Sequence, residues 1–373
     1  MRLVIHREIP DDITLATQWN ELVQHMECPE VFYTYEWSRA VSRAYRDSIE
    51  PLVMLAYQED SLVGVAALAT DKARPEAFFL AGTTADYCDF VSSPKLRHEV
   101  VTCVLSELRV LGMSMLVLAN LPSDSATEGA LAPSADLRGY NLFPQPAFQC
   151  TQVLLRTREQ RELVRRSIRH KRERRYLKAL AAKVPVVVDH LRSWDEIASA
   201  LPSFTNAHVA RFSAIGRISN LDSPERTTFL SELAKLLSPH GWITLSQLRA
   251  GEHPMAWQYA FQFARHYSFY QTTFDSGFRE YSPGFSLILK LIEEACEDSE
   301  IDFVDLGLGA EDYKKRLANA ARETLHITLA RSTVTYLRAA ARYHAAAAIK
   351  ASPRLEQYVR RVLGRPSTGN VQV

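Results

Sequence analysis

The chain lacks the features that mark disulfide-linked, zinc-binding and membrane-spanning proteins. Its five cysteines are scattered and odd in number, and no two of them have CxxC spacing. No apolar run reaches the roughly 20 residues that a membrane helix needs. The N-terminus, MRLVIHREIPDD, carries acidic residues and no long apolar centre, so we expect no secretory signal. These absences predict a reduced, cytoplasmic protein without structural zinc and without a transmembrane segment.

An excess of charge of either sign is also missing. Lysine and arginine total 44, aspartate and glutamate total 43, and the formal net charge is +1. Any contact with nucleic acid or with a membrane surface must therefore come from a local patch. The motifs GxxxxGK[ST], GxGxxG, HExxH and GxSxG are absent, and the carboxylates show no metal-ligand pairing. The sequence thus favours neither nucleotide hydrolysis nor serine or zinc hydrolysis, and it predicts no metal site.

Length and composition predict two globular domains. With 373 residues, of which 47% are hydrophobic and 23% charged, the chain is too long for one ordinary core. A sharp change in composition near the middle, rich in arginine and free of glycine and proline, predicts one basic helix that joins two halves. We predict a first domain over 1–155, this linking helix over 156–183, a second domain over 184–335, and a C-terminal helix and tail over 336–373.

The order of predicted elements is the same in both halves. Three strand-like runs between 242 and 274 are separated by short turns and predict an antiparallel meander. A helix with apolar residues at helical spacing follows over 285–295, and strands follow over 301–306 and 324–330. The region 52–120 repeats strands, helix and strand more faintly. The predicted fold class is α/β, with tandem units that each contain a mixed, mostly antiparallel sheet flanked by helices.

Segments rich in turn-forming residues predict loops. These are NLPSDSATEGALAPSAD, over 120–136, and FPQPAF, over 143–148. After Ser332 an alanine-rich stretch predicts a helix, and the final ten residues predict a frayed tail.

The turn before the helix at 285 has the properties of an anion site. The first N–H groups of a helix lack partners and carry the positive end of its dipole. Proline is well suited to open a helix, and glycine allows a close approach to the backbone. An ordinary turn closed by proline is the alternative. We predict that the anionic part of a donor binds at Arg279, Ser282, Pro283, Gly284 and Phe285.

The order of meander, Pro-Gly loop, helix and strand resembles the GNAT acyltransferases. The matching segments are AHVARF, MAWQYAF, FYQTTFDSGFREYSPG and DLGLGAEDYKKRL. More specifically, they resemble the acetyltransferase domain of proteins found with cellulose and exopolysaccharide synthesis genes, and more distantly the Fem-type peptidyltransferases. Of the GNAT loop pattern Q/R-x-x-G-x-G/A, the segment REYSPG keeps one arginine and one glycine. The resemblance implies acyl-CoA as donor, with aminoacyl-tRNA as the alternative.

Two residues after the glycine turn are candidates for the chemical step. Lys314 follows the end of a strand, where ligands of open α/β sheets usually bind. The resemblance implies that it stabilises the oxyanion of a tetrahedral intermediate, and the alternative is a solvated surface lysine. Tyr313 is a weak acid that can protonate a leaving thiolate or alkoxide. It is equally a candidate core aromatic residue.

Candidates for a base and for substrate contacts lie in the same half. His208 and Arg211 share one face of a helix, so His208 is a candidate base and Arg211 a candidate ligand of a carboxylate or phosphate. An Arg–His pair bonded to backbone is the alternative. Asp275 is a second candidate base or an ordinary turn aspartate. Gln271, in a matching segment, is a candidate substrate contact.

The basic helix is a candidate surface for polyanions. Arg165, Arg169 and Arg172 lie in its densest part and would bind tRNA, a nucleotide-linked sugar or an anionic lipid. Pairing with acids elsewhere in the chain is the alternative. The C-terminal helix is basic too and is a weaker candidate for membrane-surface contact. The sequence therefore predicts an acyltransferase acting on a small-molecule, polysaccharide or peptide-precursor acceptor, and its rival is a non-catalytic module that binds through the basic helix.

Overall fold

The computed structural model describes residues 1–169, 178, 180–182, 184–309 and 311–351 and divides the chain into two compact units. Unit 1 contains Met1–Phe148 and the described residues from Glu323 on, and unit 2 contains Gln149–Arg322. The chain passes from one unit to the other inside β7 (Asn141–Leu154) and inside β13 (Ala320–Ala330). The C-terminal helix is therefore part of unit 1, whereas the predicted domains had separated it from both halves.

Unit 1 is built on a mixed sheet in the order β1-β2-β3-β4-β6-β13, with β5 beside β3. All its neighbouring strands are antiparallel except the parallel pair β4–β6. Its elements, besides parts of β7 and β13, are β1 (Arg2–His6), α1 (Ile13–Gln24), η1 (Val31–Tyr33), α2 (Tyr35–Ala44), β2 (Glu50–Gln58), β3 (Ser61–Thr70), β4 (Glu76–Phe79), β5 (Val91–Ser92), α3 (Arg97–Val110), β6 (Met115–Pro122), α4 (Ala126–Arg138) and α11 (Thr333–Ala351).

Unit 2 repeats this plan with the sheet order β7-β12-β11-β10-β9-β8, in which only β11–β12 is parallel. Its elements are α5 (Arg158–Arg169), β8 (Val186–Leu191), α7 (Trp194–Ser213), η2 (Asn220–Asp222), α8 (Pro224–Leu237), η3 (Ser238–His240), β9 (Ile243–Ala250), β10 (His253–Phe263), β11 (His266–Phe274), η4 (Ser276–Tyr281), α9 (Pro283–Ala295), β12 (Phe303–Leu308) and α10 (Asp312–Lys315). The predicted meander, helix and strand are confirmed.

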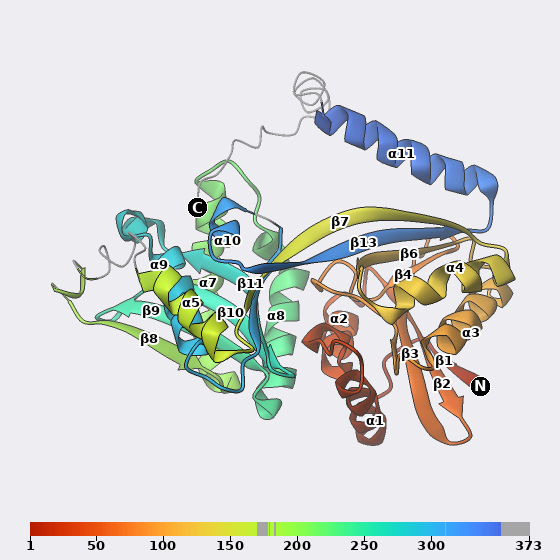
Figure 1. Ribbon diagram of the computed structural model, residues 1–373, viewed down its shortest axis with the longest axis horizontal. Coiled ribbons are helices and arrows are strands. Elements are labelled where there is room, and N and C mark those ends of the chain that lie inside the picture. Colours follow the sequence, from red (N-terminus) through yellow and green to blue (C-terminus); the bar gives the residue numbers. More distant parts are fainter. Residues whose placement is uncertain (170–177, 179, 183, 310, 352–373) are drawn as a thin grey trace. The chain divides into compact units, whose positions relative to one another are not determined.

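The two units share one element order, and the predicted fold class is confirmed. Each unit runs through a strand, two helices, a three-stranded meander, a helix, and a strand parallel to the last strand of the meander. Within unit 2, α5 and α9 cover one face of the sheet, and α7 and α8 cover the other (Figure 1). No described helix is both long and apolar enough to cross a membrane.

Both segments predicted to be loops are regular structure, so these predictions were wrong. The first contains α4, which starts at the N-cap Ser125 and ends at Gly139 in the left-handed conformation. Helical spacing of Ala130, Leu131 and Ala135 buries one side of α4, and that packing outweighs the turn-forming composition. The second segment belongs to β7, where its prolines alternate and therefore remove N–H groups from one edge only.

The described part of the predicted basic helix is α5, and Arg172 lies outside the described residues. Val164 and Ile168 bury its apolar side in the core of unit 2. The guanidinium of Arg161 donates to the backbone carbonyls of Ala295, at 3.0 Å, and of Asp298, at 2.7 Å, at the C-terminal end of α9. A cation is favourable there because the last carbonyls of a helix lack partners. This arginine closes the end of α9.

We expect Arg161→Met to lower the free energy of unfolding by about 1–3 kcal/mol, because the carbonyls at the end of α9 lose their charged donor. Arg169→Met is the matched control, since Arg169 is exposed on the same helix and should change stability by less than about 0.5 kcal/mol. Urea denaturation followed by fluorescence measures both. Equal stability of the two variants would contradict a capping role for Arg161.

Candidate functional site

Strands β11 and β12 pair over three residues and then separate. Their parallel register runs from His266–Phe303 to Ser268–Asp305. Beyond it β11 continues along β10, whereas β12 continues along β7. A register shift places Tyr270 in a bulge, with no residue opposite it on β10. Bulges bend a strand and increase its twist, so this one turns the end of β11 away from β12.

The helix that joins these two strands starts with unfilled backbone donors. The N-cap of α9, Ser282, is left-handed and makes no side-chain cap. Pro283 has no N–H, and the first two donating amides, of Gly284 and Phe285, point out of the first turn. A Cβ on Gly284 would lie 3.2 Å from the Phe274 ring, so the glycine here also permits close packing against the end of β11. The predicted anion site thus keeps backbone donors without a side-chain cap, in a first turn whose residues Pro283, Gly284 and Phe285 are buried.

Two arginines lie beside this turn. Arg211, from α7, donates to the carbonyl of Thr272 at 3.2 Å and lies 4.8 Å from the Phe274 ring centroid. Burial lowers the pKa of Arg211, and Arg279 is close enough to lower it further. Among the described residues, neither Arg211 nor Arg279 forms an ion pair with a carboxylate. Two neighbouring cations without an acid are poised for an external anion.

Tyr313 contacts the first turn of α9 and is also near Arg211. Its ring makes an edge-on contact with Phe285 at 6.0 Å, and its hydroxyl is near enough to Arg211 for their charges to interact. Burial raises the pKa of Tyr313, and Glu311 raises it further. The phenol therefore keeps its proton at neutral pH. It is both a packed aromatic residue and an available acid.

Lys314 is buried, so the alternative of a solvated lysine is excluded for this residue, whereas Lys315 beside it is exposed. Its Nζ donates to the carbonyl oxygens of Leu308, at 2.7 Å, and Gly307, at 3.5 Å. It also forms an ion pair with Glu311 at 3.0 Å. The ammonium group thus holds the glycine turn together and places a positive charge at the carboxyl end of β12.

His208 is 3% exposed and stacks on Phe212 with a centroid distance of 4.6 Å. Its Nδ1 is hydrogen-bonded to the Ser219 hydroxyl at 2.8 Å, and the side chain of Gln271 also hydrogen-bonds the ring. Burial, followed by the charge of Arg211, lowers the pKa of His208 to about 4. The imidazole is therefore neutral at pH 7, and it accepts a proton only weakly.

The remaining predicted residues lie outside this group. Asp275 is exposed and accepts a hydrogen bond from the Gly277 amide at 2.9 Å, as a turn aspartate does. Arg165 forms an ion pair with Glu297 at 3.4 Å, just beyond the C-terminal end of α9. That end is about 20 Å from the first turn of α9 at 1.5 Å per residue. The structure therefore does not bring Arg165 or the neighbouring α5 surface, including Arg169, to the anion site.

A buried carboxylate that the sequence did not single out for the site organises the turn after β12. Asp305 is 2% exposed and accepts hydrogen bonds from the amide of Gly307 at 2.8 Å and from the Gln152 side chain at 2.9 Å. Gln152 lies on β7, about 150 residues earlier in the chain, so no local pattern could have pointed to it. In the sequence, the turn is indicated by Asp305 followed two residues later by Gly307.

The equivalent helix of unit 1 has a different start. α3 begins at Arg97, which is 1% exposed. The Arg97 guanidinium donates to Asp89 at 3.2 Å, to Thr127 at 2.7 Å and to the Ser92 carbonyl at 2.7 Å. The arginine at the start of α3 is thus paired with an acid of the chain, although α3, like α9, has no side-chain cap. Among the described residues, the arginines beside this helix start that lack an acid partner are those of unit 2.

The region that contains the parted strands matches a known protein family. Residues 164–315 match the acetyltransferase (GNAT) domain family. The matched GNAT domain extends from α5 to α10 and includes the parted strands, the first turn of α9 and Lys314. No curated protein matches the sequence.

Solved structures resemble the chain over most of its length. The crystal structure of FemX has a TM-score of 0.61 at 9% identity, covering 88% of this chain and 97% of that one. A conserved protein of unknown function from Bacteroides thetaiotaomicron has a TM-score of 0.56 at 9% identity, covering 88% and 100%. The C-terminal domain of a putative lysylphosphatidylglycerol synthetase from Agrobacterium fabrum has a TM-score of 0.50 at 10% identity, covering 87% and 93%. At these identities the likeness is one of fold alone.

We expect the His208 ring to titrate near pH 4 rather than near 6.5. Between these values the unfolded chain binds a proton that the folded chain does not, so stability falls as the pH falls, by about 1.4 kcal/mol per pH unit. NMR titration of labelled histidine measures the pKa directly. His208→Asn should remove this part of the loss of stability at low pH. A His208 ring that titrates near pH 6.5 in the folded chain would contradict the buried environment.

Proposed function

We propose that unit 2 transfers an acyl group from acyl-CoA to an amine or hydroxyl acceptor by direct attack, without a covalent enzyme intermediate. The observation that carries the proposal is the pair Arg211 and Arg279, which have no acidic partner in the described part of the chain and lie beside the uncapped first turn of α9. Backbone amides at a helix start and two guanidinium groups together suit the pyrophosphate of a coenzyme A. The match to the GNAT domain family supports this donor.

The residues around the parted strands supply the chemistry of the proposed reaction. As the acceptor attacks the thioester carbonyl, negative charge develops on the oxygen, and the buried cation of Lys314 stabilises it. The C–S bond then breaks, and the protonated phenol of Tyr313 gives its proton to the leaving thiolate. The acceptor loses a proton to a base, for which His208 and Asp275 remain the candidates. His208 is buried and weakly basic, whereas Asp275 is exposed and holds a turn.

Aminoacyl-tRNA is the second candidate donor, favoured by the likeness of fold to FemX over nearly the whole of both chains. In this alternative, Arg165, Arg169 and Arg172 would contact the nucleic acid, and affinity would fall steeply with salt. The acceptor would be a small molecule or a polysaccharide or peptide precursor. The type of acetyltransferase found with exopolysaccharide synthesis genes remains a prediction from the sequence resemblance, as does contact with a membrane surface.

The deciding experiment is calorimetry of the full chain with acetyl-CoA, longer acyl-CoAs, and charged and uncharged tRNA, followed by mass spectrometry of candidate acceptors. Acyl-CoA binding in the micromolar range, competed by free coenzyme A, supports the proposal. Binding of charged tRNA alone supports the second donor. Binding of polyanions with no transfer to any acceptor would leave the non-catalytic module as the better description.

We expect Arg211→Met to weaken acyl-CoA binding by about tenfold or more, because one desolvated guanidinium–phosphate contact is lost. Arg217→Met is the matched control: Arg217 also lies over the Phe212 ring, at 5.5 Å, but is exposed. Calorimetry measures both affinities, and circular dichroism checks the fold. Should both variants bind acyl-CoA as the natural chain does, Arg211 is not part of the donor site.

We expect Lys314→Met to lower turnover by roughly 10²–10³, the usual effect of removing one donor to an oxyanion, with a much smaller change in donor affinity. Lys315→Met changes the exposed neighbour and should be neutral. Because the Lys314 ammonium also binds the Leu308 carbonyl, the melting temperature is measured in parallel. A variant that keeps its fold and turns over at the natural rate would place the transfer chemistry elsewhere.

A further inference from the structure

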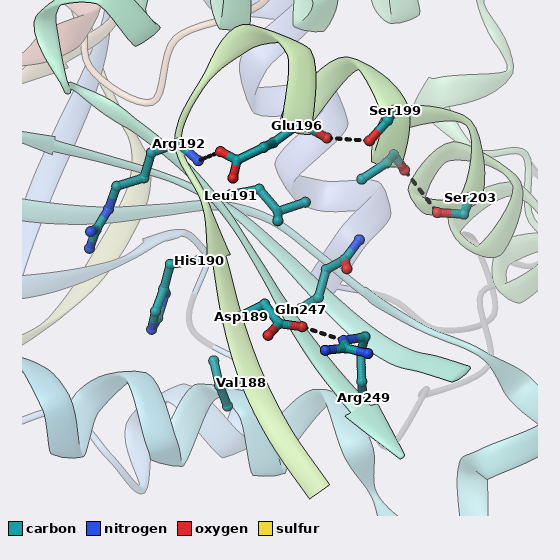
Figure 2. A pocket seen from close by; sticks show the side chains of 11 residues that line it. Val188, Asp189, His190, Leu191, Arg192, Glu196, Ser199, Ser203, Gln247 and Arg249 are labelled. Carbon is teal, nitrogen blue, oxygen red and sulfur yellow. Dashed lines mark hydrogen bonds and ion pairs between the residues drawn. The ribbon is translucent and has the colours of Figure 1, made fainter. Parts of the chain in front are cut away.

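Unit 2 has a polar pocket away from the parted strands. It has a volume of about 830 Å³ and lies between β8, β9 and the first half of α7 (Figure 2). This volume is within the range of about 300–1,000 Å³ typical of small-molecule sites. Gln247 lies on β9, which is separated from β11 by β10, so the pocket is on the order of 10 Å from the acyl-transfer strand. A ligand held here is not the reacting group of the proposed function.

The pocket contains a mostly buried glutamine that makes no hydrogen bond within the described part of the chain. Gln247 is only 9% exposed, and its side chain makes no hydrogen bond to any described residue. It lies on the same side of the sheet as Leu191 and the pair formed by Asp189 and Arg249 (Figure 2). A polar side chain in such a place, without a partner from the chain, is available to a ligand or to water.

The same cross-strand row contains further unpaired groups. Gln247 is opposite Trp257 on β10, and Trp257 is opposite Thr273 on β11. The indole N–H of Trp257 and the hydroxyl of Thr273 are buried without a hydrogen-bond partner among the described residues. Three neighbours in one row therefore carry unused polar groups on the face that α7 covers. Gln247 is the member of this row that lines the pocket.

The charges around the pocket do not select for an anion. The guanidinium of Arg249 is already paired with the carboxylate of Asp189. The start of α7 is closed by a capping box, in which the Glu196 carboxylate accepts from the amides of Arg192, at 3.1 Å, and Ser193, at 3.0 Å. With two acidic and two arginine side chains, the lining has no net charge. Arg192 makes no ion pair among the described residues, but it is exposed, whereas Arg211 of the donor site is partly buried.

What remains in the pocket is suited to hydroxyl groups. Ser199 and Ser203 donate to carbonyls of their own helix, so their oxygens present free lone pairs. The Gln247 amide offers hydrogen-bond donors and an acceptor. Each hydroxyl of a sugar can both donate and accept a hydrogen bond. We propose that this pocket is a binding site for a neutral saccharide, with Gln247 as its central contact. This inference goes beyond the proposed acyl transfer and is tested by binding alone.

Saturation-transfer NMR and calorimetry of the full chain with glucose, galactose and N-acetylglucosamine test the inference, with glycine and inorganic phosphate as charged comparisons. Gln247→Leu should weaken saccharide binding by at least about tenfold. It should leave the melting temperature nearly unchanged, because the amide makes no hydrogen bond to a described residue. Ser199→Trp is the second pocket variant, in case Gln247→Leu fails to fold. It changes an exposed residue, and the larger side chain should block the pocket. Gln262→Leu is the matched control, since Gln262 is a meander glutamine outside the pocket.

Saturable saccharide binding that is lost in both pocket variants and kept in Gln262→Leu supports the site. Three results would overturn it. The first is that no saccharide binds, and the second is that binding survives in both pocket variants. The third is that glycine or phosphate, rather than a saccharide, binds in a Gln247-dependent manner. Acyl-CoA affinity, measured in the same variants, should stay unchanged, which separates this site from the proposed donor site.

Discussion

The brief pairing of β11 with β12 is the constraint on which the candidate site depends. Two parallel strands joined by a buried helix would ordinarily stay together, but the bulge at Tyr270 turns β11 away, and β12 pairs instead with β7. The opening lies at the carboxyl ends of both strands, beside the first turn of α9. Arg211 from α7, Tyr313 from α10 and the backbone of Gly284 reach the same place for this reason.

The two ends of α9 differ in their partners. Arginine side chains bind at its C-terminal end, and its N-terminal end has no side-chain cap. At the C-terminal end the Arg161 guanidinium satisfies the last carbonyls, and Arg165 pairs with Glu297. At the N-terminal end no side chain caps the helix. A helix dipole favours cations at its carboxyl end and anions at its amino end. The chain supplies the cations and leaves the anion to a ligand.

The repeat of one element order in both units does not make their sites equivalent. In unit 1 the Arg97 guanidinium at the start of α3 is paired with the Asp89 carboxylate. In unit 2 the arginines beside the start of α9 have no acid partner among the described residues, and the face under α7 holds two buried polar groups without a hydrogen-bond partner there. Burying such groups is unfavourable unless something binds them. The two units therefore share a fold and differ in whether the arginines near the equivalent helix start have an acid partner.

The sequence by itself determined the meander, the helix at 285–295 and the repeat, because period-2 and period-3.6 burial are local patterns. It also placed Lys314 and Tyr313 after a strand. It misread α4 and the start of β7, where packing outweighs a composition rich in proline and serine. Only the tertiary structure decided that Lys314 is buried, that Gln152 binds Asp305 from about 150 residues away, and that Gln247 makes no hydrogen bond to a described residue. Burial and polar pairing depend on residues distant in the chain, and no local pattern records them.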